Sequence, residues 1–442
     1  MGGVFLRFLM FLTFFFVVYR PPCVFCEEVD AENYEMEGLS NVSGFDNLME
    51  EISLLYNDIH IGKVGIKPAY EVKEVFDDNV FDASDERKED FYTLHKPELE
   101  LITPFSDHIL AHLKYDAEIY DYEYIQERDR VNQSLKGTVE FYFANDFKLT
   151  FSDHFRKHRI PPGVQRRFFA DIEDLDIPIE DQGIDVFVDR RDITTNAAAV
   201  DIDFPDFFEH LGFSLHYKNN DVSYKRDEFE GSEYNTDTIN ADIDYHYPSA
   251  PVTISSGFLY AIDRYDSEKN NDAINKEIPF DIVWNFTPKN KLYVNTNYKI
   301  SKFRKHSTLE NFEGWEVVLG NRYTINPVSS IELYGERSVK EQRLTDNNSY
   351  FDTNVGIKYM IQHARFEGYL DAQYFNMKFF ESIEQIEDEE EVDGISVNLN
   401  IKYKPQEWWF AEFDYAYNRR DNNISLGDFT KNTVTLGLGI NF

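Results

Sequence analysis

The stretch HILAHLKYDAEIYDY carries chemically active side chains at every second position. His112, Lys114, Asp116 and Glu118 alternate with apolar or small residues. Alternation with this period places the polar groups on one face of a β-strand and the apolar groups on the other. A row of imidazole, ammonium and carboxylate groups can hold ions and exchange hydrogen bonds with hydroxyl-rich solutes. That face needs water, because unpaired charges in an apolar core are costly.

The same two-sided pattern recurs in about eighteen runs, each near the ten residues that a tilted strand needs to cross a bilayer. The runs lie near 63–76, 91–102, 108–122, 134–144, 147–156, 194–204, 209–219, 236–247, 251–263, 276–286, 290–303, 313–325, 328–339, 349–361, 363–378, 393–403, 407–418 and 432–442. Further carboxylates that we expect on the polar, lumen-facing side are Asp242, Asp244, Glu367, Asp371, Glu412 and Asp414.

The connections between these runs alternate between short turns, often with proline, and long acidic loops such as ESIEQIEDEEEVDG. Short periplasmic turns and long extracellular loops are typical of outer-membrane barrels. The sequence therefore predicts an all-β chain that forms a transmembrane, antiparallel, up-and-down barrel of about 18 strands, within a range of 16–20. This predicts an integral protein of the outer membrane of a Gram-negative bacterium, in contact with lipid and lipopolysaccharide.

The chain ends in TVTLGLGINF, a strand with a strictly apolar face. That face consists of Val434, Leu436, Leu438, Ile440 and Phe442. In a closed barrel the last strand pairs with the first, so no sheet edge is left in the lipid. An apolar strand that ends in Phe resembles the signal that the bacterial barrel-assembly machinery recognises, which makes that machinery an expected partner.

The composition narrows the class of protein. The formal net charge is -37, which argues against nucleic-acid binding because that function needs a basic face. Aromatic residues make up 16% of the chain, which argues against an acidic disordered protein.

Residues 1–26 are expected to be a signal peptide, with Arg7 ahead of a short apolar run, although a membrane anchor remains the alternative. Cys23 and Cys26 would leave with the signal peptide. Residues 27–60 are expected to form an acidic periplasmic lead with an amphipathic helix, and residues 61–442 the barrel.

The segment EVFDDNVFDASDERKEDFYTLHKPELEL carries a recognisable pattern. It contains Phe76, Asp78, Asn79, Val80 and Phe81, followed by Pro97, Leu99 and Leu101. With the tyrosine-rich strand that follows, this pattern resembles the opening of the outer-membrane β-barrel family called β-barrel porin 2, over roughly residues 64 to 160. The resemblance implies a conduit or accessory for exopolysaccharide export, with polysaccharide export proteins as partners, and it transfers no catalytic residues.

Two local features leave alternatives open. Asp78 and Asn79 are interpreted as a turn device, or as part of a cation site with Asp77, Asp82 and Asp85. The long connection 157–193 is unusually basic for this chain, and loops of that length are often functional. Its proposed basic group is Arg156, Lys157, Arg159, Arg166 and Arg167, which would form a constriction in the lumen or lie outside and hold lipopolysaccharide phosphates.

We therefore expect a porin-like channel with a saccharide cargo, neutral or cationic because the wall is acidic. The alternative is a structural or adhesive barrel with a filled lumen. A receptor with a plug is disfavoured because residues 27–60 are too few for a folded plug. No enzymatic activity, metal or cofactor is expected, because the inward-facing His112 and His154 lack a motif partner.

Overall fold

The computed structural model describes residues 59–82, 87–143, 146–160, 163–164, 187–188, 191–208, 210–224, 233–247, 250–265, 272–303, 311–341, 349–379, 391–423 and 428–441. The chain divides into two units, Met1–Val42 and Ser43–Phe442, and the described residues belong to the second. The expected signal peptide and the lead helix lie outside the described residues. In the part of the chain that the structure describes, no helix has the length and hydropathy of a membrane-spanning helix.

The described chain is almost entirely β-structure. The barrel strands are β2 (Val64–Asp77), β3 (Asp90–Ser106), β4 (Ile109–Tyr122), β5 (Arg130–Tyr142), β6 (Lys148–Ile160), β9 (Arg191–Phe208), β10 (Leu211–Tyr224), β11 (Tyr234–His246), β12 (Val252–Tyr265), β13 (Ala273–Thr287), β14 (Asn290–Phe303), β15 (Phe312–Asn326), β16 (Ser329–Glu341), β17 (Ser349–His363), β18 (Phe366–Phe379), β19 (Glu391–Gln406), β20 (Trp409–Asn422) and β21 (Phe429–Asn441). The remaining elements are β1 (Ile59–Ile61), η1 (Gln126–Arg128), β7 (Gly163–Val164) and β8 (Phe187–Val188).

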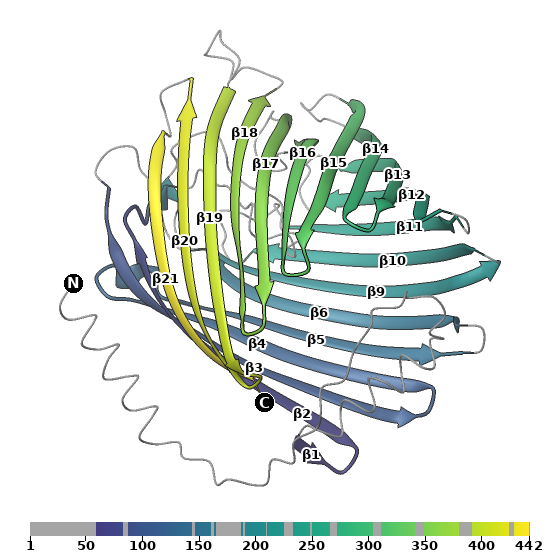
Figure 1. Cartoon of the computed structure of the whole chain (residues 1–442), viewed down its shortest axis with the longest axis horizontal. Coiled ribbons are helices and arrows are strands. Elements are labelled where there is room, and N and C mark those ends of the chain that lie inside the picture. Colours follow the sequence, from purple (N-terminus) through teal and green to yellow (C-terminus); the bar gives the residue numbers. More distant parts are fainter. Residues whose placement is uncertain are drawn as a thin grey trace. The chain divides into compact units, whose positions relative to one another are not determined.

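Each barrel strand pairs antiparallel with the next one along the chain, and β6 pairs with β9 across the long connection. The last strand closes the sheet by pairing with the first, from Ala69↔Asn441 to Asp77↔Thr433. Figure 1 follows this path from purple β2 to yellow β21. The structure is therefore a closed, up-and-down barrel of 18 strands, and every predicted run matches one strand. This confirms the fold class read from the sequence.

The two ends of the barrel differ in their connections. At one end the strands are joined by short turns, such as 288–289 between β13 and β14 and 327–328 between β15 and β16. At the other end the connections are longer, from 423–428 between β20 and β21 to 161–190 between β6 and β9. We call these the short-turn end and the long-loop end. By the rule for outer-membrane barrels, the long-loop end faces outside the cell.

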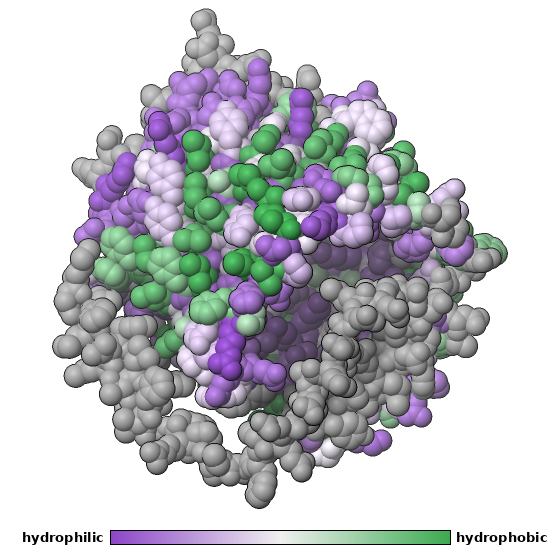
Figure 2. All heavy atoms as spheres, in the orientation of Figure 1, coloured by the Kyte–Doolittle hydropathy of each residue, from purple (hydrophilic) through white to green (hydrophobic). Residues whose placement is uncertain are grey.

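The barrel wall has two unlike faces. On β16, β17 and β18 the outward-facing Leu333, Val355 and Leu370 are 57%, 58% and 45% exposed, which suits lipid rather than water. Figure 2 shows apolar residues on the outside of the wall and a hollow lined by hydrophilic residues. The period-two alternation of the sequence predicts lipid-facing apolar residues, and the structure places eight of them on this outward face: Ile109, Leu113, Tyr115, Ile119, Leu399, Ile401, Leu436 and Leu438.

The proposed assembly signal follows the same alternation. Val434, Leu436, Leu438 and Ile440 share the outward face of β21, whereas Phe442 lies outside the described residues. On the inward face, small apolar clusters are the nearest equivalent of a core. They are formed by Tyr350, Phe375, Met377 and Val392, and by Ile102 and Leu110.

A group of side chains at the long-loop end fastens β21 to the chain just after β2. The Lys431 ammonium lies 2.9 Å from Asp77 Oδ2 and 3.0 Å from Asp82 Oδ1. The Asn432 backbone N–H and side-chain amide donate to the two carboxylate oxygens of Asp78, at 2.6 and 2.7 Å. The Asn79 amide donates to the Thr430 carbonyl at 3.2 Å. We call these seven residues the seam latch.

The seam latch gives a structural role to Asp78 and Asn79, which belong to the segment that carries the family resemblance. The Asn79 backbone N–H donates to Asp77 Oδ1 at 2.9 Å, as expected of a turn device. However, Asp77 and Asp82, two members of the candidate cation site, are paired with Lys431. Asp85 lies outside the described residues, and within these no group of acidic, His or Cys residues is arranged to hold a metal.

A charge on the lipid-facing side should be far more costly than one on the inner side. Leu436→Arg should destabilise the barrel by about 2–4 kcal/mol, the usual cost of Arg at the bilayer midplane. The same change at neighbouring Thr435 should cost much less, because Thr435 lies on the inner face, next to Asp414 of the adjacent strand β20. Urea unfolding in lipid vesicles measures both values, and equal costs at the two positions would contradict the assignment of faces.

Removing the cation of the seam latch should open the barrel at its seam. Lys431→Met leaves Asp77, only 7% exposed, without its ammonium partner. The loss of one partner of a buried ion pair typically costs about 3–5 kcal/mol. The matched control is Lys404→Met, which breaks the exposed pair with Glu367 and should cost under about 1 kcal/mol. Similar costs for the two variants in vesicle unfolding would argue against the latch.

Candidate functional site

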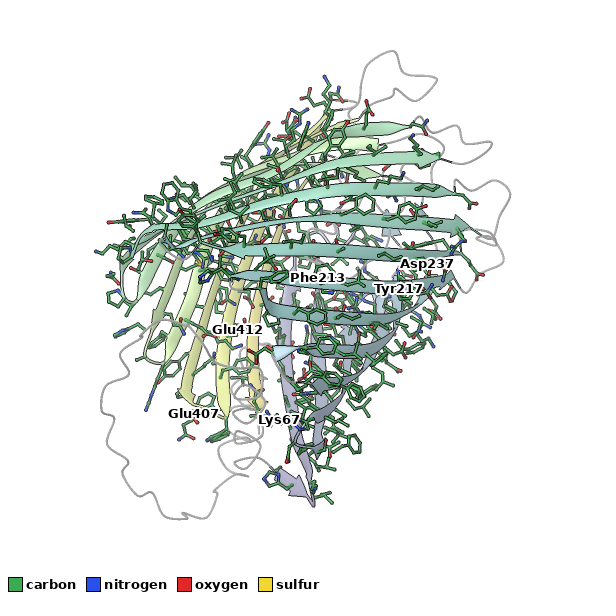
Figure 3. The ribbon with its side chains drawn as sticks, turned by 90° about the vertical axis from the view of Figure 1, so that its right-hand side faces the viewer. Lys67, Phe213, Tyr217, Asp237, Glu407 and Glu412 are labelled. Atoms are coloured by element: carbon green, nitrogen blue, oxygen red, sulfur yellow. The ribbon has the colours of Figure 1, made fainter. Side chains whose placement is uncertain are left out.

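The inner wall of the barrel is the candidate functional site. The strand register places every sequence-predicted lumen residue on this wall. On β4 they are His112, Lys114, Asp116 and Glu118; on β11, β18 and β20 they are Asp242, Asp244, Glu367, Asp371, Glu412 and Asp414. Figure 3 shows Glu412 on β20 and, for comparison, Glu407 in the turn that precedes this strand.

Around β3 to β6 the inner wall is a lattice of ion pairs between neighbouring strands. Lys96 and Glu118 are 2.6 Å apart, and Lys114 and Glu98 are 2.9 Å apart. On β6 and β5, Lys148 lies 2.8 Å from Glu140. These charges compensate each other, so this part of the wall is hydrophilic but close to neutral.

The same arrangement continues across the seam. Lys73 on β2 lies 3.1 Å from Glu412 on β20, passing over Gly437, which has no side chain to block the contact. Asn400 on β19 donates to Glu412 and to Asp414, at 2.6 and 2.5 Å. The amide and the ammonium together fix the positions of both carboxylates.

The inner wall of β9 to β13 is different, because it carries carboxylates with little compensation. Its aspartates include Asp201, Asp203, Asp242, Asp244 and Asp281. His216 lies among them, with Nδ1 2.9 Å from Asp201 and Nε2 3.9 Å from Asp242. Among the described residues, no Lys or Arg makes an ion pair with Asp244 or Asp281. We call this region the acidic sector.

A row of tyrosines and glycines crosses the inner wall from β14 to β17. The register aligns Tyr293, Gly320, Tyr334 and Gly356 on successive strands. Each tyrosine ring lies over the glycine of the following strand: a Cβ added to Gly320 would be 2.2 Å from Tyr293, and one added to Gly356 would be 2.3 Å from Tyr334. The glycines therefore allow the rings to lie flat along the wall instead of standing out into the lumen.

The hydroxyl groups of this tyrosine row are held by carboxylates. Tyr293 donates to Glu332 at 2.7 Å, and Tyr334 donates to Asp371 at 2.8 Å. Glu332 is in turn held by Arg322 at 2.7 Å. The rings are fixed at both ends, so their outer faces form a rigid surface that borders the lumen.

Sequence reasoning missed one pair of residues with catalytic types. Ser134 Oγ on β5 lies 2.9 Å from His154 Nε2 on β6, although the two are far apart in the sequence. Arg156 Nε donates to the same nitrogen at 3.0 Å. An imidazole nitrogen that already accepts from a guanidinium is a poor general base, so the contact does not provide the activated serine of a hydrolase.

The structure separates the basic group that the sequence assigns to one loop. Arg156, Lys157 and Arg159 belong to β6, which extends to Ile160, so the connection is shorter than predicted. Alternation along β6 directs Arg156 inward but Lys157 and Arg159 outward. Placing Lys157 and Arg159 in a luminal constriction was therefore wrong: Arg159 instead pairs with Asp192 on the outward face. Arg166 and Arg167 lie outside the described residues.

The acidic sector should make any current through the barrel prefer cations. Asp244→Asn combined with Asp281→Asn should lower the cation preference at low salt, because rings of charge set selectivity. The effect should fade at about 1 M salt, where charges are screened within about 3 Å. The current of single barrels in a planar bilayer measures the cation preference at low and at high salt.

The matched control for this selectivity experiment is Asp153→Asn combined with Asp393→Asn, two carboxylates on the outward face. It should leave the ion preference unchanged. A double inner-wall variant with the selectivity of the parent at low salt would mean that ions do not pass the acidic sector.

Comparison with known proteins supports the fold and the location. Residues 284–442 match the family model of the outer membrane protein beta-barrel domain. No curated protein matches the chain. The matched segment covers β14 to β21 and includes the strand that closes the barrel.

The solved structures that resemble the chain are outer-membrane barrels with low sequence identity. The FrpB iron transporter from Neisseria meningitidis (F3-3 variant) has a TM-score of 0.54 and 10% identity, with 85% of this chain and 65% of that chain covered. The apoprotein form of its F5-1 variant has a TM-score of 0.52 and 9% identity, with 88% and 83% covered. The siderophore receptor PirA from Pseudomonas aeruginosa gives 0.48 and 7%, with 85% and 80% covered. The family match and the fold agree with an integral position in the outer membrane.

Proposed function

We propose that this integral outer-membrane β-barrel is a porin-like conduit for a saccharide polymer, and that it serves as a channel or accessory in exopolysaccharide export. The observation that carries the proposal is the tyrosine row on the inner wall. Its flat rings, fixed hydroxyls and neighbouring carboxylates form a surface that suits sugars rather than ions alone. The proposal assigns no reaction and no cofactor to the chain.

Sugars offer two kinds of surface to a protein, and the inner wall provides a counterpart for each. Their apolar C–H faces stack on aromatic rings, and Tyr293 and Tyr334 present such rings along the wall. Their hydroxyls exchange hydrogen bonds with carboxylates and amides, and Asp371, Glu412 and Asn400 present these on β18 to β20.

The charge of the wall favours a neutral or cationic cargo. The acidic sector repels polyanions, whereas the ion-paired wall of β3 to β6 adds no positive field that would offset it. A neutral polysaccharide has no such conflict. Barrel-assembly machinery and polysaccharide export proteins remain the proposed partners for insertion and for delivery of the polymer.

The names of the similar structures do not change this proposal. FrpB is described as an iron transporter, and at 10% identity the likeness supports a shared barrel fold only. Within the described residues, no cluster of carboxylates and imidazoles has the geometry to hold a metal. The proposed cargo therefore follows from the wall itself.

Removing the rings of the tyrosine row should weaken sugar binding. Neutral oligosaccharides added to a planar bilayer that holds the parent barrel should interrupt its ion current. Tyr293→Ala combined with Tyr334→Ala should raise the half-blocking concentration roughly tenfold, which corresponds to about 1.4 kcal/mol for two lost stacking contacts.

The control variant is Tyr298→Ala combined with Tyr374→Ala, two tyrosines on the outward face of β14 and β18. Neutral oligosaccharides should block the current of this variant at the same half-blocking concentration as that of the parent. A parent current that no neutral oligosaccharide blocks would refute the saccharide cargo. A parent that carries no current would support the alternative of a structural or adhesive barrel with a filled lumen.

A further inference from the structure

Basic residues on the outward face of the barrel are confined to one end. Among the strand residues that the structure describes, the outward-facing Lys and Arg are Lys157, Arg159, Arg264, Lys276, Lys302, Arg337, Lys378 and Arg419. Each lies within a few residues of the long-loop end of its strand. The net charge of the chain is -37, so this concentration of cations does not follow from composition.

Three of these cations lie on consecutive strands. Arg264 is on β12, Lys276 on β13 and Lys302 on β14, and all three side chains are exposed. In the register, Lys276 is opposite Ile300 and Lys302 is opposite Ile274, so the two lysines are diagonal neighbours on the same face. We call these three residues the outer basic patch.

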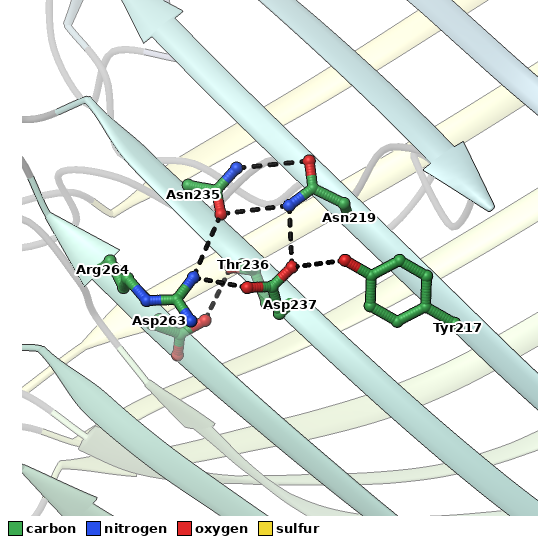
Figure 4. Close-up of polar contacts among 7 residues, drawn as sticks. All are labelled: Tyr217, Asn219, Asn235, Thr236, Asp237, Asp263 and Arg264. Atoms are coloured by element: carbon green, nitrogen blue, oxygen red, sulfur yellow. Dashed lines mark hydrogen bonds and ion pairs between the residues drawn. The ribbon is translucent and has the colours of Figure 1, made fainter.

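The surroundings of Arg264 show the depth of the patch in the membrane. Arg264 pairs with Asp237, which also accepts from Asn219 at 2.9 Å and from Tyr217 at 2.8 Å. Figure 4 shows these contacts together with Asn235, and Figure 3 shows where Tyr217 and Asp237 lie on the wall. Asp237 is near the long-loop end of β11, and the Tyr217 hydroxyl reaches it from the middle of β10. Amides and charges are costly in hydrocarbon. This network therefore lies at the level of the lipid headgroups.

The two lysines of the patch are not compensated within the described residues. No carboxylate there lies within ion-pair distance of Lys276 or Lys302. The Lys276 ammonium is 5.9 Å from the ring centre of Tyr260, which supports the apolar stem while the charge reaches outward. Uncompensated cations at headgroup depth are complementary to an anionic headgroup.

We infer that the outer basic patch binds the phosphorylated sugar headgroup of lipopolysaccharide in the outer leaflet. The long-loop end faces outside, which is the leaflet where the patch would meet this lipid. Lys276 and Lys302 supply point charges for a phosphate, and a phosphate accepts charge-assisted hydrogen bonds from such donors. Asn235 lies beside Arg264, the third cation of the patch, and its amide and that of neighbouring Asn219 can contact the sugar hydroxyls.

The test compares the purified barrel in two kinds of nanodisc, one of phosphatidylcholine alone and one that also contains lipopolysaccharide. Native mass spectrometry counts the lipopolysaccharide molecules retained after release from the disc, and thermal unfolding measures the stabilisation. The parent should retain lipopolysaccharide and unfold at a higher temperature in its presence. Lys276→Gln combined with Lys302→Gln should lose most of both effects.

Three further samples make the outcome specific. Lys289→Gln combined with Lys291→Gln removes the same charges from the short-turn end of the same hairpin and should behave like the parent. Lys276→Arg combined with Lys302→Arg should retain binding, which separates loss of charge from misfolding. Dephosphorylated lipopolysaccharide should bind weakly, and inorganic phosphate alone should not stabilise the parent.

Several results would overturn the inference. One is a parent that gains no stability and retains no lipopolysaccharide relative to phosphatidylcholine. Another is a Lys276→Gln and Lys302→Gln variant that retains as much lipopolysaccharide as the parent. Equal binding of the dephosphorylated lipid would also refute it, because the ligand would then be the sugar and not the phosphate.

Discussion

The hydrogen bonds between β21 and β2 are the interaction on which the rest of the structure depends. A sheet in lipid cannot leave an unpaired edge, because each unsatisfied backbone group costs several kcal/mol where no water is available. Closure requires strands separated by the whole length of the chain to meet in register, from Ala69↔Asn441 to Asp77↔Thr433. The seam latch adds side-chain bonds at the long-loop end of this pairing, where Lys431 and Asn432 bind the chain just after β2.

Once the sheet is closed, alternation along each strand determines the chemistry of both surfaces. One face meets lipid and must be apolar, and the other encloses the lumen and can carry charge. The overall content of hydrophobic residues, 42%, is therefore enough for a protein with no continuous core among its described residues. The same rule explains why Lys157 and Arg159 cannot join Arg156 in the lumen, although all three are close neighbours in the sequence.

The sequence was sufficient to predict the properties that depend on the alternation of apolar and polar residues along a strand. It predicted the eighteen strands, the alternation of short turns and long loops, and the face on which residues such as Leu113 and Asp116 lie. It could not predict contacts that depend on register between strands. The tyrosine row needs Tyr293 opposite Gly320, and the contact of Ser134 with His154 needs β5 and β6 to be aligned. The seam latch needs residues near positions 80 and 430 to be neighbours, which only closure brings about.

The glycines of the inner wall connect stability with the proposed function. Tyr293 and Tyr334 could stand out into the lumen, but Gly320 and Gly356 let them lie along the wall and bury one ring face against backbone. Gly394 and Gly439 accept Phe375 and Phe410 in the same way. Covering a glycine in this manner compensates for its missing side chain in a strand and also keeps the ring out of the passage. A barrel that only anchors or adheres gains nothing from a clear lumen, whereas a conduit for a polymer needs rings that sugars can stack on without closing the path. The flat rings therefore favour a conduit over a filled barrel.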